Sequence, residues 1–140
     1  MIKIYSAIDQ GHLLHMINRL SDITSRTDVI PEDNFLQLAT LKMPKGKTFR
    51  PHRHEWKNNT HTQNIAQESW VVIQGSVKCY FYDIDDSLIH TTILKPGDCS
   101  ITLAGGHTYE ILEEDTVVYE YKSGPYQGVE LDKRFLDEQV

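Results

Sequence analysis

The chain has little cysteine, little positive charge and no long hydrophobic run, and each shortage excludes a class of protein. Two cysteines occur among 140 residues, Cys79 and Cys99. Their spacing is not that of a zinc pair, so we expect small buried side chains in a reducing compartment. A net charge of −6 provides no basic face for nucleic acid or anionic lipid. The apolar runs are too short to span a membrane. We therefore expect a cytoplasmic protein that binds neither nucleic acid nor a membrane.

The composition is that of one globular domain, with 39% hydrophobic and 24% charged residues. Residues 1–33 differ in pattern from the rest. Leu13, Ile17 and Leu20 recur at helical spacing. This spacing predicts one short amphipathic helix from about Asp9 to Leu20, followed by a polar connection.

From residue 34 onward the sequence is typical of β structure. Short β-branched and aromatic runs alternate with turn residues such as Pro44-Lys45-Gly46, Gly75, Pro96-Gly97 and Gly105-Gly106. This pattern predicts an all-β protein, with an antiparallel sandwich or barrel over residues 34–122. About eight strands form a barrel that is wide enough for one small ligand. We expect residues 123–140 to form a C-terminal tail packed on the barrel.

The stretch FRPHRH, residues 49–54, is the clearest chemical signal. If it is a strand, His52 and His54 project from the same face, because alternate side chains point the same way. Two imidazoles on one face can bind a metal ion together. Arg50 would share that face and could bind a carboxylate or phosphate of a substrate. The alternatives are a hydrophilic turn rich in histidine and a surface arginine.

The spacing of several residues resembles the two motifs of the cupin superfamily. Gly46, the two histidines, Glu68 and Gly75 resemble G-x5-H-x-H-x(3,4)-E-x6-G, with a polar insertion before the glutamate. The stretch GDCSITLAGGHTYEI, residues 97–111, resembles the second motif. The chain is similar to the small single-domain cupin metalloproteins of surface-polysaccharide gene clusters. The resemblance implies a single jelly-roll-like cupin β-barrel.

The same resemblance implies a divalent metal ion held by His52, His54, Glu68 and His107. Such a donor set suits Fe, Ni, Mn or Zn and leaves positions open in a six-coordinate shell. The glutamate is matched only from its downstream side, so Glu55, His61 or Gln63 of the inserted residues 55–67 could replace it. In the second motif Leu103 stands for the proline and Ile111 for the asparagine.

Three functions remain open from the sequence. The first is a metal-dependent enzyme, such as an isomerase or dioxygenase, acting on a small polar metabolite like a sugar or keto acid. Arg50 and Tyr109 would then contact the substrate, although a buried structural tyrosine is the alternative for the latter. The second is a metal-free sugar-nucleotide epimerase or ketoisomerase with His52 or His107 as general base. The third is a non-catalytic binding barrel. By analogy with the family we expect a homodimer.

Overall fold

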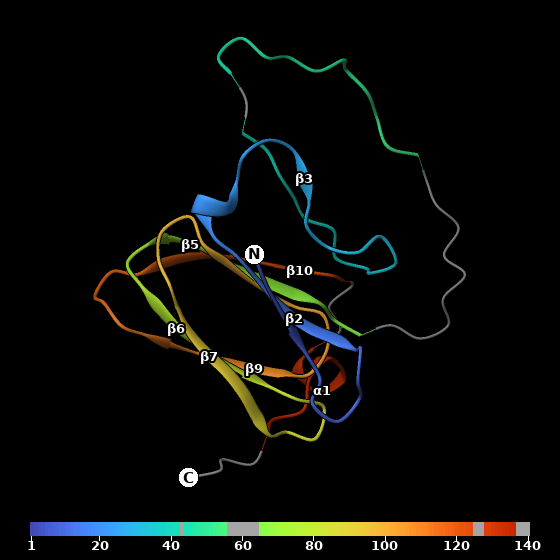
Figure 1. The fold of residues 1–140 in the computed structure, drawn as a ribbon, viewed down its shortest axis with the longest axis vertical. Coiled ribbons are helices and arrows are strands. Elements are labelled where there is room, and N and C mark those ends of the chain that lie inside the picture. The colour runs from blue at the N-terminus through green and yellow to red at the C-terminus, as the bar shows by residue number, and fades with distance from the viewer. Residues whose placement is uncertain (43, 56–64, 125–127, 137–140) are drawn as a thin grey trace.

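The computed structural model describes residues 1–42, 44–55, 65–124 and 128–136, which form two main antiparallel sheets (Figure 1). The five-stranded sheet has the order β1 (Ile2–Tyr5), β2 (Leu13–Asn18), β8 (Cys99–Thr102), β5 (Glu68–Gln74) and β10 (Val117–Lys122). The three-stranded sheet has the order β7 (Leu88–Leu94), β6 (Val77–Tyr82) and β9 (Gly106–Ile111). β3 (Thr27–Asp28) and β4 (Ala39–Thr40) form a small separate ladder. The expected all-β class is confirmed for the described residues.

A hydrophobic core lies between the two main sheets. Val72 of β5 packs there with Val77, Cys79 and Phe81 of β6, and all four are fully buried. Every second residue of β6 belongs to this core, which is the alternation expected of a strand with one buried face. Gly75, at φ 79°, makes the turn that reverses the chain between β5 and β6.

A second core lies on the outer face of the five-stranded sheet. Met16 of β2 and Ile101 of β8 pack there against Val29, Ile30 and other side chains of the segment before β4. β2 and β8 are consequently buried on both faces, and β8 has no exposed residue.

The helix predicted from about Asp9 to Leu20 is wrong, because this part of the chain contains β2. Residues 14–18 are all buried, with His15 and Ile17 facing the three-stranded sheet and Met16 facing the outer core. A strand that is buried on both faces loses its alternation of polar and apolar residues. The leucines and isoleucine of β2 therefore matched a helical spacing by coincidence.

The two helices found in the described residues are short. η1 (Leu20–Asp22) follows β2, and α1 (Val129–Asp132) lies in the C-terminal segment. Within the described ranges, neither has the length and apolar character needed to cross a membrane.

Candidate functional site

A carboxylate and an imidazole meet between the two main sheets. Nε2 of His107, the second residue of β9, lies 3.1 Å from Oε1 of Glu68, the first residue of β5. The two residues are 39 positions apart in the sequence, and their side chains are 23% and 12% exposed. Glu68 shares its face of β5 with Trp70 and Val72, which pack in the core between the sheets. The fold thus directs both polar groups inward.

The negative charge of Glu68 determines which ring nitrogen of His107 carries the proton. Burial opposes ionisation of Glu68, but the hydrogen bond from His107 and the charges of Lys133 and Lys122 hold its pKa below the ordinary value. A hydrogen bond to this carboxylate requires a proton on Nε2 of His107. Nδ1 of the neutral ring then carries a lone pair. This Nδ1 is buried and has no hydrogen-bond partner among the described residues.

Aromatic and polar side chains form a wall beside this pair. Tyr109 of β9 stacks on Trp70 of β5, with ring centroids 3.9 Å apart. The Tyr109 hydroxyl lies 2.9 Å from Oγ of Ser100, and Trp70 Nε1 donates to Glu120 at 2.9 Å. Burial raises the pKa of Tyr109, so its phenol stays protonated. Tyr109, expected to contact substrate, is therefore placed next to His107 but already has a partner in Ser100.

The segment that carries His52 and His54 does not form the strand that the sequence predicts. Residues 44–55 are exposed and contain no strand, and Figure 1 shows the teal-to-green trace extending away from the two main sheets. The prediction of a strand here was wrong. A strand needs a hydrogen-bonded neighbour, and within the described residues no strand is paired with this segment. The two imidazoles still lie close to each other, with ring centroids 5.4 Å apart.

The four predicted metal ligands therefore fall into two pairs. Glu68 contacts His107, and His52 lies beside His54, but no group of three or more potential ligands occurs within the described part of the chain. Arg50 is exposed, and its carbonyl oxygen lies 3.1 Å from Nδ1 of His52.

Of the alternative ligands from the insertion, only Glu55 lies within the described residues. Glu55 is exposed and lies 3.9 Å from Arg53 Nε. His61 and Gln63 lie outside the described residues.

A second buried polar cluster was not predicted from the sequence. His15 of β2 is fully buried, with its ring nitrogens 3.1 Å from Thr102 Oγ1 and 3.0 Å from the Tyr82 carbonyl. Burial lowers the pKa of His15 to about 4, so the ring is neutral at pH 7. Asp83 accepts hydrogen bonds from the Ser6 hydroxyl and the Ala7 backbone. These satisfied contacts join β1 and β2 to the end of β6, which is a structural role.

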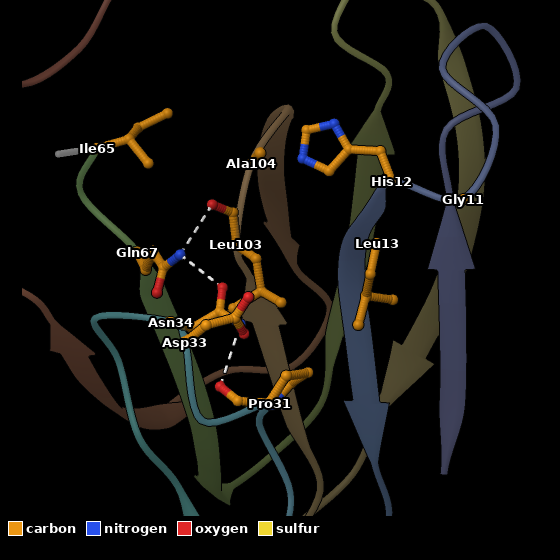
Figure 2. Close-up of a pocket in the computed structure, with 10 residues that line it drawn as sticks. All are labelled: Gly11, His12, Leu13, Pro31, Asp33, Asn34, Ile65, Gln67, Leu103 and Ala104. Atoms are coloured by element: carbon orange, nitrogen blue, oxygen red, sulfur yellow. Dashed lines mark hydrogen bonds between the residues drawn. The ribbon is translucent and has the colours of Figure 1, made fainter. Parts of the chain in front are cut away.

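A surface pocket of about 590 Å³ lies on the other side of the five-stranded sheet (Figure 2). Gln67 lines it, whereas the adjacent Glu68 points to the opposite face. The Gln67 amide donates to Asn34 Oδ1 at 2.9 Å and to the Leu103 carbonyl at 3.3 Å. Its oxygen accepts from the Leu36 backbone at 2.9 Å. These contacts of Gln67 hold the segment before β4.

Comparison with protein-family models, with curated proteins and with solved structures found no match. Among the described residues, Glu68 and His107 offer an anionic oxygen and an imidazole lone pair in one partly buried place. A cation that replaced the proton between Nε2 and Oε1 would have both groups as ligands, and with that proton in place the free Nδ1 can act as a base.

Proposed function

We propose that the chain is a cupin-like metalloprotein that binds a divalent cation through Glu68, His107, His52 and His54 and acts on a small polar metabolite. The observation that carries the proposal is the contact between Glu68 and His107. These residues were selected from the sequence by motif spacing alone, and they lie 3.1 Å apart between two sheets. The reaction would be an isomerisation or oxygenation of a sugar or keto acid in a cytoplasmic homodimer.

The residues of the site fit a cation in two respects. Nε2 of His107 faces the Glu68 carboxylate at 3.1 Å, so a cation could take the place of the proton between them, and Glu68 supplies a charge that burial would otherwise disfavour. Imidazole and carboxylate donors suit Fe, Ni, Mn and Zn. A cation held there would act as a Lewis acid that polarises a substrate carbonyl.

The histidines of the exposed segment would reach the site by pairing with β9. Within the described ranges β9 is hydrogen-bonded only to β6, so its other edge is open. An extended segment can add to an open sheet edge through main-chain hydrogen bonds. Residues around 48–54 forming such a strand would bring His52 and His54 to the side of His107. The chain's own contribution would then be to hold the cation and exclude water from it.

A second function is supported by the free ring nitrogen of His107. A carboxylate that binds one imidazole nitrogen fixes the tautomer and leaves the other nitrogen as a base. Glu68 and His107 have this relationship without any cation. The corresponding activity would be a metal-free epimerase or ketoisomerase acting on a nucleotide-activated sugar. A binding barrel without catalysis, the third function open from the sequence, has no separate observation in its favour.

Metal analysis of protein purified without a histidine tag tests the main proposal. After reconstitution with Fe, Ni, Mn or Zn we expect about one equivalent per chain for one of these ions. His107→Asn and Glu68→Gln should each weaken binding by about tenfold or more, because each removes a donor. His52→Asn and His54→Asn should do the same. His12→Asn, which changes an exposed histidine on the β1–β2 connection, is the matched control and should bind normally.

Three results would contradict the proposal. Less than about a tenth of an equivalent under all reconstitution conditions would exclude a specific cation site. Normal metal content in the Glu68→Gln and His107→Asn variants would place the ion elsewhere. Solvent deuterium exchange into a nucleotide-activated keto sugar by metal-free protein, lost in His107→Asn, would favour the metal-free enzyme instead.

A further inference from the structure

A lysine projects into the site from the end of β10. Lys122 is the last residue of this strand and is paired in register with Glu68 of β5. Its side chain is 22% exposed, and its Nζ lies 3.4 Å from Oδ2 of Asp132, which is 13% exposed. Nζ of Lys133 lies 3.9 Å from the same oxygen. Two ammonium groups thus converge on one carboxylate oxygen close to the Glu68–His107 pair.

The charges of these groups act on the site itself. Burial opposes the charge on Lys122, but the hydrogen bond to Asp132 and the charges of Asp132, Glu120 and Glu68 hold its pKa above the ordinary value. The charges of Lys133 and Lys122 also contribute to the lowered pKa of Glu68. The two lysines therefore lie within electrostatic reach of the groups proposed to bind the cation.

The carboxylate between the lysines belongs to a weakly packed element. Asp132 is the last residue of α1, a four-residue helix in which no residue is fully buried. Leu131 and Phe135 on either side of it are each 77% exposed. Polar contacts provide much of the attachment, since Arg134 also pairs with Asp86 at 3.2 Å on the surface. Within α1 itself, little apolar burial would be lost if Asp132 left its place.

We propose that Lys122 and Lys133 form a subsite for the carboxylate of a small organic acid, and that Asp132 occupies this subsite when the ligand is absent. A carboxylate is the expected ligand group because both lysines contact the carboxylate of Asp132 in the structure. The subsite takes the anchoring role that the sequence assigned to Arg50, which is exposed in the segment 44–55. The inference rests on the proposed function in one respect: the rest of the ligand would extend from the two lysines toward Glu68 and His107.

An NMR titration of the full chain with acetate, acetamide and inorganic phosphate tests the subsite. Asp132→Asn removes one internal competitor, and it should lower the apparent Kd for acetate by about tenfold if Asp132 holds the site for most of the time. Lys122→Met should abolish acetate binding both in the parent chain and in the Asp132→Asn variant. Lys122→Arg, which keeps the positive charge, should still bind acetate. Asp28→Asn, which removes a carboxylate from the exposed pair with Arg26, is the matched control and should leave the acetate Kd unchanged. Acetamide, which has no charge, should not bind.

Several results would overturn the inference. One is that Asp132→Asn binds acetate no more tightly than the parent chain. Another is that a folded Lys122→Met variant binds acetate as well as the parent chain. Tighter binding of phosphate than of acetate would reject the carboxylate class. If Lys122→Met does not fold, the comparison of Asp132→Asn with Asp28→Asn decides alone.

The same titration separates this inference from the proposed function. It is run once on chelator-treated protein and once on metal-loaded protein, with metal content measured in each variant. Acetate binding that follows Asp132 and Lys122 in a chain that takes up no metal supports the subsite and rejects the cation site. Normal metal uptake, together with an acetate Kd that is unchanged in the Asp132 and Lys122 variants, supports the cation site and rejects the subsite.

Discussion

A single buried histidine gives the fold a dependence on pH. Burial lowers the pKa of His15 to about 4 from the ordinary value of 6.5. In the unfolded chain the ring takes up its proton near pH 6.5, so between pH 6.5 and pH 4 the unfolded state binds more protons. The contribution of His15 to stability is therefore complete above pH 6.5 and is lost as the pH falls to 4. The expected loss is about 3 kcal/mol of unfolding free energy.

Urea unfolding at pH 7, 5.5 and 4.5 measures this loss. Carboxylates with lowered pKa, such as Asp83, also destabilise the fold in acid, so the comparison must be between variants. His15→Asn should be less stable at pH 7, because its contacts to Thr102 and Tyr82 are changed, but should show a flatter pH profile. His12→Asn should keep the parent slope. Parallel profiles for His15→Asn and the parent would show that His15 is not the group that titrates.

The turn between β8 and β9 is an element whose geometry depends on one glycine. Gly105 has φ 78°, and a Cβ there would meet the Tyr82 carbonyl oxygen and lie 3.1 Å from Nε2 of His15. Gly105→Ala should therefore destabilise the fold by about 3 kcal/mol through backbone strain and displaced hydrogen bonds. Gly46 has φ 87° with no atom within 4 Å of such a Cβ, so Gly46→Ala isolates the backbone cost of about 1 kcal/mol. Thermal unfolding measures both, and equal losses would refute the role of the close approach.

Elements with one buried face were predictable from the sequence, and elements defined by distant neighbours were not. β6 was recognisable as a strand from the alternation that buries Val77, Cys79 and Phe81, and its separation from β5 was recognisable from Gly75. β2 was read as a helix because cores on both faces removed its alternation. The segment around His52 was read as a strand because its residues suit one, whereas a strand also requires a partner.

Some residues of the candidate site could likewise be predicted from the sequence, and others could not. Glu68 and His107 could be selected because motif spacing records where each residue sits on its own strand. The contact of Lys122 with Asp132 left no such signal, because a single ion pair between a strand end and a four-residue helix has no period to detect. Ser100 and Glu120, which hold Tyr109 and Trp70, could be found only once β8 and β10 were placed beside β5.

At the scale of the whole molecule, the two sheets differ in how completely they are covered. The five-stranded sheet has a core on each face, one against the three-stranded sheet and one under the segment before β4. The three-stranded sheet is smaller, and in the described structure its β9 edge has no strand beside it. The segment 44–55, which is fully exposed, lies in the chain directly before the residues that lead to β5. The proposed cation site therefore requires the molecule to gain a strand where its smaller sheet is incomplete.

Hydrogen exchange in the presence and absence of the bound cation measures this gain. Adding the ion that binds should slow amide exchange at residues 47–55 and in β9 by about tenfold or more, because new main-chain hydrogen bonds would form between them. β7, the opposite edge of the same sheet, is the internal control and should change little. His107→Asn should remove the effect, since the segment would lose the ion that holds it. Unchanged exchange at residues 47–55 in metal-saturated protein would show that no strand is added. Equal slowing of β7 and β9 would indicate general stabilisation by the ligand rather than closure of the segment onto β9.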